Sequence, residues 1–295
     1  MKAFVLAVVV ALSVGRVAEA QNKLPADAPT VKLVEAGKDP KKPLRFTAKK
    51  GMKKSLTTTM TMSMTMQGGA NPMPPQTIPP IQMVVDLKVT DVSADGDIRY
   101  EFVLKQPTVV AGKNDNKMVV DAMKETVKGM TGLTGHAVVT NRGFTREADV
   151  KMPANANPQT VQLVESLKQS MTSIAAPVPE EAVGVGAKWD TITTLSQNGM
   201  TFVQTATNHL TALKGTKATL AITIKQDAKP QKITTQGVTF DLEKYSGAGS
   251  GETQFDLAGL VPSSAKMGMK SEMAMSASGQ KIGMKIDIQM TMKGK

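Results

Sequence analysis

Methionine side chains at alternate positions are the feature of this sequence with the clearest chemical potential. They are Met60, Met62, Met64 and Met66. Thioether sulfur is a soft ligand that suits Cu(I), so a row of these sulfurs could bind copper. Methionine is also flexible and fills irregular apolar spaces. The same residues could therefore line a groove for a flexible apolar ligand, or pack inside a protein core.

The surroundings of these methionines favour core or groove over copper. The intervening positions hold Thr61, Ser63 and Thr65, a period of two that predicts a half-buried strand with one apolar and one hydroxyl face. No histidine lies near this stretch. We therefore expect no metal and no other cofactor, with copper handling kept as an alternative.

Residues for other site chemistry are scarce. The chain has no cysteine and two histidines, His136 and His209, and neither has a carboxylate or second histidine at ligand spacing. The sequence contains no nucleophile elbow, no phosphate-binding loop and no zinc-protease motif. The aspartates between residues 91 and 97 lack the spacing of a calcium loop. These observations predict a protein that is not an enzyme and has no catalytic residues.

The charge of the chain points to an anionic partner. Lys and Arg number 36 against 25 Asp and Glu, a formal net charge of +11. Nucleic-acid binding usually combines basic residues with stacking aromatics, yet the chain has 7 Phe, 2 Tyr and 1 Trp. We therefore expect no nucleic-acid partner. Attraction to an anionic envelope surface is one interpretation of the basic residues, and an ordinary solvated lysine face is the default interpretation.

The first 20 residues have the features of a secretory signal peptide. Lys2 precedes an apolar run over residues 3–14, and Ala18-Glu19-Ala20 provides small residues for cleavage before Gln21. No later apolar stretch reaches membrane-spanning length, so the mature chain is expected to lack a transmembrane segment. Cleavage leaves a net charge of +10, and with no cysteine we expect a periplasmic or secreted bacterial protein.

The mature chain divides into two parts. Residues 21–45 hold four prolines and are expected to form a flexible lead-in, with one short strand near Val31–Val34. Residues 46–295 are expected to form a single β-rich domain. Strands are predicted over residues 52–66, 81–92, 98–104, 189–195, 200–213, 216–226 and 282–292. The proline-rich residues 68–80 are expected to form a loop, and the glycine-rich residues 246–251 a bulge or turn.

Two stretches switch to the helical period. The first helix is predicted near residues 116–129, with a buried stripe of Val119, Met123 and Val127. The second is predicted near residues 158–174, after Asn157 and Pro158, which are typical of a helix start. Its stripe contains Val164, Leu167 and Met171.

The strands and helices together predict an α+β fold that is mostly antiparallel β. We expect a large curved sheet or open barrel with two covering amphipathic helices. Apolar positions of the sheet and of the second helix would then line a groove. The candidate ligand-binding residues are Met60, Met62, Met64, Met66, Leu87, Val164, Leu167, Met171, Met284 and Met290.

Several C-terminal motifs resemble those of a family of uncharacterised exported bacterial proteins. They are the Gly249-Ser250-Gly251 run, Phe255-Asp256-Leu257, Gly259-Leu260 and the methionine-alternating strands. Lys50-Gly51 before a Thr/Met strand also fits, and the resemblance covers most of residues 46–293. The expected architecture resembles the open-barrel lipid and lipoprotein carriers of the LolA/LppX type. Neither resemblance supplies catalytic residues.

The sequence therefore predicts a non-enzymatic exported protein that binds a lipid or other apolar ligand in a methionine-lined groove. A structural or interaction module of the envelope, without a ligand, is the alternative. These hypotheses differ in whether the methionine face meets a ligand or meets other protein side chains.

Overall fold

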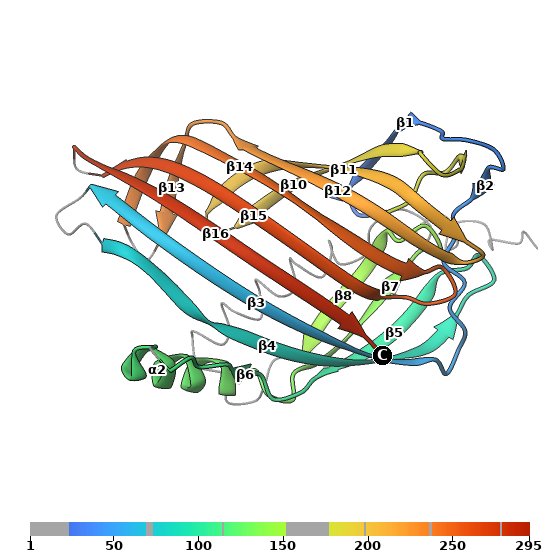
Figure 1. Cartoon of the computed structure of the whole chain (residues 1–295), viewed down its shortest axis with the longest axis horizontal. Coiled ribbons are helices and arrows are strands. Elements are labelled where there is room, and N and C mark those ends of the chain that lie inside the picture. Colours follow the sequence, from blue (N-terminus) through green and yellow to red (C-terminus); the bar gives the residue numbers. More distant parts are fainter. Residues whose placement is uncertain are drawn as a thin grey trace, which may run out of the picture.

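Long antiparallel strands dominate the chain in a computed structural model (Figure 1). The structure describes residues 24–68, 73–113, 115–151, 177–197, 199–235, 238–277 and 279–295. The signal peptide expected at residues 1–20 and the helix expected near residues 158–174 lie outside these ranges. Both therefore stay predictions.

The described strands match the period-two segments of the sequence. They are β1 (Thr30–Glu35), β2 (Lys42–Pro43), β3 (Lys53–Gly68), β4 (Met73–Val92), β5 (Ile98–Leu104), β6 (Thr108–Val109), β7 (Thr134–Val139), β8 (Thr145–Lys151), β9 (Ala182–Val183), β10 (Lys188–Gln197), β11 (Met200–Lys214), β12 (Lys217–Ala228), β13 (Gln231–Thr235), β14 (Val238–Asp256), β15 (Pro262–Ala277) and β16 (Gln280–Gly294). Each strand predicted from the sequence has a counterpart here, so the β-rich prediction is confirmed.

Most of these strands join one 14-stranded sheet among the described residues. Its order is β1-β10-β11-β12-β14-β15-β16-β3-β4-β5-β7-β8, with β13 beside β14 and β6 beside β4. Every pair is antiparallel, as expected for strands joined by short turns. β2 and β9 form a separate two-stranded sheet.

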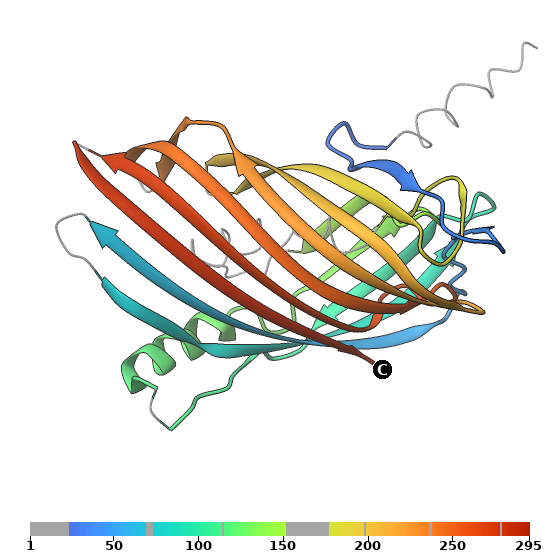
Figure 2. The same ribbon diagram turned by 45° about the horizontal axis from the view of Figure 1, so that its top comes forward.

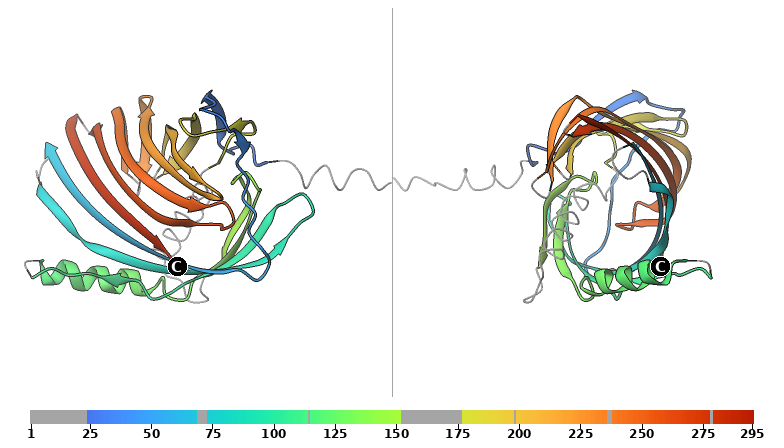
Figure 3. Two further views of the ribbon diagram at one scale, coloured as in Figure 1. Left: turned by 45° about the vertical axis from the view of Figure 1, so that its right-hand side comes forward. Right: turned by 90° about the vertical axis from the view of Figure 1, so that its left-hand side faces the viewer.

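The large sheet is open and strongly curved (Figures 2 and 3). The edge strand β8 lies near β10, the neighbour of the other edge strand β1. One hollow of about 500 Å³ is lined both by residues 145–148 of β8 and by residues 193–196 of β10. The pairing of β16 with β3 brings the C-terminal strands beside the N-terminal ones. The two methionine-rich parts of the sequence therefore become neighbours in the sheet.

The proline-rich segment contains a strand, which corrects the prediction of a loop. β4 begins at Met73 and includes Pro74, Pro75, Pro79 and Pro80. Among the described residues, the first part of β4 has β3 as its strand neighbour on one side, and β6 joins the other side at residues 81–82. Proline lacks a backbone donor and is tolerated where one side of a strand is unpaired. An edge position therefore explains this segment.

The glycine-rich segment is also strand, so the prediction of a bulge or turn there was wrong. Residues 246–251 lie inside β14 and pair continuously with β12 and with β15. Flanking strands supply the hydrogen-bonding partners that overcome the low strand preference of glycine.

The described residues contain one helix, α2 (Lys117–Lys128), which confirms the helix expected near residues 116–129. Asn116 caps it, since its side-chain oxygen accepts a hydrogen bond from the Met118 backbone N–H at 2.9 Å. Val127 is buried and Met123 packs against the core, as predicted, whereas Val119 is 44% exposed and the neighbouring Val120 is buried in its place.

The position of α2 differs from the expected cover over the sheet. Its main neighbour in the sheet is the short strand β6, and it lies alongside β4 and β6 (Figure 1). The part of the chain that the structure describes therefore has one short helix beside a large open sheet, not two covering helices. No helix among the described residues combines the length and apolar character required to cross a membrane.

The segment expected to be a flexible lead-in contributes to the sheet. β1 pairs with β10 and forms one edge, and Leu44, just after β2, is fully buried. Close by in the sequence, the Phe46 ring packs against the Phe255 ring, with the two ring centroids 5.7 Å apart. Residues 30–46 therefore belong to the packed part of the molecule.

Candidate functional site

One side of the curved sheet is apolar across β4, β3, β16 and part of β15. Met60 of β3 lies opposite Met290 of β16 and Ile81 of β4, and Met290 lies opposite Met267 of β15. Residues aligned across a sheet share a face. Alternation along each strand and register between strands thus combine into one continuous apolar surface.

This apolar side is the side toward which the sheet curves. Tyr100 of β5, Trp189 of β10 and Leu220 of β12 lie far apart in the strand order, yet they belong to a single core cluster. Side chains from such distant strands can meet only on the concave side. We call this side the inner face and the opposite side the outer face.

The inner face has two regions with different packing. In the first, the filled end, segments outside the large sheet cover the strands, and the residues are almost fully buried. Its central residues are Leu44, Tyr100, Trp189, Leu220 and Phe255. In the second, the methionine section, the side chains are half-buried and belong to neither core cluster of the described residues. Its residues are Met60, Met62, Met64, Met66, Met267, Met269, Met284, Ile286, Ile288 and Met290.

The outer face opposite the methionine section is polar. On β3 it presents Thr57, Thr59, Thr61, Ser63 and Thr65, at the positions between the methionines. On β16 it presents mainly charged and amide side chains, including Lys285, Asp287 and Gln289. The period of two therefore separates a polar side from an apolar side, although side chains on both sides of this part of β3 are half-buried.

Six of the predicted ligand-binding residues come together in the methionine section. Met66 lies opposite Met284 and Met60 lies opposite Met290, with Met62 and Met64 between them on β3. Leu87 shares the inner face but lies opposite Phe102 and packs against the core at the filled end. Val164, Leu167 and Met171 lie outside the described residues.

The expectation of no metal in this section, with copper as the alternative, stays a prediction. Directly opposed side chains on neighbouring strands have Cβ atoms about 5 Å apart, and successive residues on one face are about 7 Å apart. Opposed pairs such as Met60 and Met290 are therefore the closest thioethers that copper could use. Within the described ranges, no cluster of three His, Cys, Asp or Glu side chains is arranged to hold a metal ion.

Sequence reasoning missed a row of three glycines on the inner face. Gly247, Gly249 and Gly251 of β14 lie between the inner positions of β12 and β15. A Cβ atom on Gly249 would lie 2.7 Å from the Gly268 carbonyl oxygen, and one on Gly251 would overlap the Lys266 carbonyl oxygen. Glycine is therefore required for the close approach of β14 and β15. The alternate spacing of these glycines was the available signal.

A polar row beside Gly247 was missed as well. It consists of Gln204 (β11), Gln226 (β12), Tyr245 (β14) and Ser271 (β15), all on the inner face. The Tyr245 hydroxyl donates to Gln226 Oε1 at 2.5 Å, and Gln226 Nε2 donates to Gln204 Oε1 at 2.8 Å. Burial raises the pKa of Tyr245, while a hydrogen bond with Ser271 acts in the opposite direction. No single-residue motif marks this row, because its members come from four strands.

The histidine environments differ from the sequence expectation at one position. His136 Nε2 lies 2.8 Å from Glu147 Oε1, although no carboxylate is near His136 in the sequence. The pairing of β7 with β8 brings these residues together. The His136 hydrogen bond and the Arg99 charge lower the pKa of Glu147. This exposed pair lies on the outer face, away from the methionine section.

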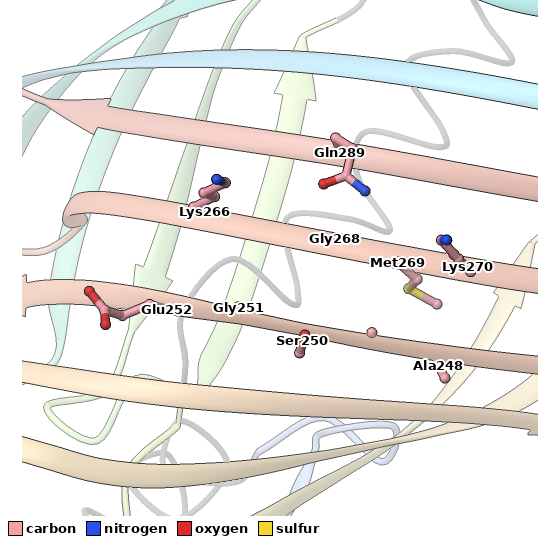
Figure 4. A pocket seen from close by; sticks show the side chains of 10 residues that line it. Ala248, Ser250, Gly251, Glu252, Lys266, Gly268, Met269, Lys270 and Gln289 are labelled. Carbon is pink, nitrogen blue, oxygen red and sulfur yellow. The ribbon is translucent and has the colours of Figure 1, made fainter.

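A shallow hollow of about 570 Å³ lies over β14, β15 and β16 (Figure 4). Figure 4 shows Glu252, Lys266 and Gln289 around the backbone of Gly268. Gly268 leaves room because it has no side chain, and Glu252, Lys266 and Gln289 are exposed. Such solvated side chains are typical of an ordinary polar surface. The inner face is therefore the stronger candidate site.

Comparison with known proteins gives one family match. Residues 162–261 match a family of unknown function, DUF6263. This range includes the motifs between Gly249 and Leu260, but it is narrower than the resemblance expected over residues 46–293. The comparison with curated proteins gives no match. The chain therefore contains, over residues 162–261, a segment similar to DUF6263, within a large antiparallel sheet.

Proposed function

We propose that this protein is a non-enzymatic exported carrier that binds the acyl chains of a lipid, or another elongated apolar ligand, on the methionine section. The observation behind the proposal is a half-buried apolar surface that extends over β3, β16 and the Met267–Met269 part of β15. An apolar surface of this extent on a soluble domain is typical of an interaction site.

The chemistry of the section suits flexible chains. Methionine has three rotatable side-chain bonds and a polarizable sulfur, so a methionine surface adapts to ligands of different shape. Burial of apolar area contributes roughly 25 cal/mol per Å². A chain lying across Met64, Ile286 and Met267 would gain that contribution without needing a matched polar group.

The remaining features of the proposal concern location and partners. The signal-like residues 1–20 support export to the periplasm or beyond the cell, and the net charge supports contact with an anionic envelope surface. Exposed Lys266, Lys270 and Lys285 on the outer face would provide part of this attraction. A large curved sheet with an apolar inner face is also consistent with a LolA/LppX-type carrier, an analogy of architecture only.

The test compares one charge placed on each face of the same strand. Met62→Asp puts a carboxylate in the methionine section, whereas Thr61→Asp puts one on the outer face at the neighbouring position. The proteins are purified from the periplasm, and organic extracts are analysed by mass spectrometry for stoichiometric lipid. Binding of the fluorescent hydrocarbon diphenylhexatriene is measured in parallel.

We expect lipid with the wild-type protein and with Thr61→Asp, and loss of lipid and probe binding with Met62→Asp. Circular dichroism should show the same strand content in all three proteins. Absence of both lipid and probe from the wild-type protein would contradict the proposal. The alternative, a structural envelope module without a ligand, would then be favoured.

A further inference from the structure

The polar row interrupts the inner face beside the methionine section. Ser271 lies opposite Ile286 of β16, and Ile286 lies opposite Met64 of β3. Gly247 lies opposite both Gln226 and Ser271 and has no side chain. Gln226, Ser271 and the adjacent Tyr245 can therefore approach one another over the Gly247 backbone.

Gly247 leaves room for this arrangement. A Cβ atom at this position would lie 2.9 Å from Gln226 Oε1 and 3.1 Å from Gln226 Cβ. These distances are shorter than an ordinary carbon contact. A side chain at residue 247 would crowd Gln226, whose side chain would have to shift to make room.

The hydrogen bonds of the row run in one direction. Tyr245 donates to Gln226, and Gln226 donates to Gln204. The Gln204 Nε2 group is then the last donor. Its two hydrogens have no acceptor among the described residues. Hydrogen bonds in such a chain polarise one another, which strengthens the terminal donor.

The polar row is largely buried, so the hydrogen bonds of its side chains affect stability and binding. Gln226 is 7% exposed and Tyr245 is 8% exposed, and Gln204 is half-buried. A buried amide destabilises a protein unless its hydrogen bonds are made. No fully buried side-chain nitrogen or oxygen of the described residues lacks a hydrogen-bond partner, so the Gln204 Nε2 group is accessible on the inner face, where it can donate to a ligand acceptor.

The surroundings favour an uncharged acceptor. The inner positions of β10, β11, β12, β14 and β15 that the strand register identifies hold no charged side chain. Neutral amide and hydroxyl donors stabilise a carbonyl oxygen, but an anion here would lack a cation to offset its desolvation.

We propose that the polar row binds the ester carbonyl oxygen of an acyl lipid, with Gln204 Nε2 as the donor. This inference rests on the proposed function, because the acyl chain would extend from the row onto the methionine section. The polar row then fixes the position of the ligand along the inner face, and the methionines adapt to its chain.

The test separates the carbonyl from the chain by using two fluorescent probes. Methyl parinarate is a polyene chain with an ester, and diphenylhexatriene is a polyene hydrocarbon without any acceptor. Both are titrated against the wild-type protein, Gln204→Leu and Tyr245→Phe. Thr205→Leu is the matched control, since it makes a similar change on the outer face of the same strand.

We expect Gln204→Leu to weaken methyl parinarate binding about fivefold, the effect of one hydrogen bond. Diphenylhexatriene binding should change less than about twofold. Tyr245→Phe should weaken ester binding by a smaller factor, because it removes only the polarising donor, and Thr205→Leu should change neither probe.

Two results would overturn the inference. If Gln204→Leu leaves ester binding unchanged, or weakens both probes equally, the polar row is structural and the proposed function still stands. If the wild-type protein binds neither probe, both the inference and the proposed function fail. Circular dichroism and thermal melts of each variant ensure that a loss of binding is not a loss of fold.

Discussion

The filled end and the methionine section use the same alternating pattern with different results. At the filled end, Trp189 is fully buried and its indole N–H donates to the Pro177 carbonyl oxygen at 3.0 Å. Segments outside the large sheet, including Leu44 and Phe46, cover this region. In the methionine section, Met62 and Met290 are half-buried and lie outside the core clusters of the described residues.

This difference in packing suggests different roles for the two regions of the inner face: the filled end stabilises the fold, and the methionine section binds. A fully buried aromatic side chain has fixed contacts and a large contribution to the free energy of unfolding. A half-buried methionine contributes less and can change rotamer at little cost. We therefore infer that packing at the filled end maintains the curvature of the sheet. We also infer that the side chains of the methionine section can rearrange to bind a ligand.

The largest expected contrast is between Trp189→Ala and Met290→Ala. Trp189→Ala should lower the free energy of unfolding by about 3–5 kcal/mol, because it leaves a large cavity in a fully buried site. Met290→Ala should lower it by only about 1 kcal/mol, since part of its surface is already exposed. Urea unfolding followed by circular dichroism measures both. Equal losses would show that the methionine section is as tightly packed as the filled end.

A second contrast depends on pH. Burial raises the pKa of Tyr100, at the filled end, to about 12, whereas a tyrosine in an unfolded chain titrates near about 10. The unfolded chain therefore loses this proton first as the pH rises. The contribution of protonated Tyr100 to the free energy of unfolding is therefore present in full below about pH 10. It falls by about 2–3 kcal/mol as the pH approaches 12.

Tyr100→Phe tests this expectation because it removes the titrating group and keeps the ring. The free energy of unfolding of the wild-type protein should fall more steeply than that of the variant above about pH 10. Below about pH 9 the two curves should run parallel. Parallel curves over the whole range would mean that Tyr100 is accessible to water, and that this end is less well filled than described.

The smallest expected change in stability comes from glycine-to-alanine substitutions, which compare the crowded glycine row of the inner face with a glycine on the outer face. Gly251→Ala should destabilise the protein by about 1–2 kcal/mol, because its methyl group would overlap backbone of β15. Gly268→Ala should be nearly neutral, because its nearest contact is the movable Gln289 amide at 2.9 Å. Thermal melts compare the two variants. A greater loss for Gly268→Ala would contradict the close approach of β14 and β15.

Local sequence signals were sufficient for many individual elements. The Thr/Met alternation identified β3, and Asn116 with its apolar spacing identified α2. The signals failed where the neighbours of a segment mattered more than its own residues. The prolines of β4 are accommodated by an edge position, and the glycines of β14 by close strands on both sides. The strand propensity of a segment contains no information about which strands will lie beside it.

The candidate site shows the same division. Met60 and Met290 could each be assigned to an apolar strand face, but their opposition depends on the β16–β3 register, which joins segments more than 200 residues apart. The polar row needs the registers of four strands at once. Single-strand periodicity carries no information about such pairings.

The sequence by itself therefore determined which side chains share a face of each strand, because successive residues in a strand point to opposite sides. Only the tertiary structure decided that the methionine side is concave, since alternation is the same whichever way a sheet bends. The tertiary structure also decided that Trp189 is fully covered and Met290 is not, because burial depends on which distant segments pack over a strand.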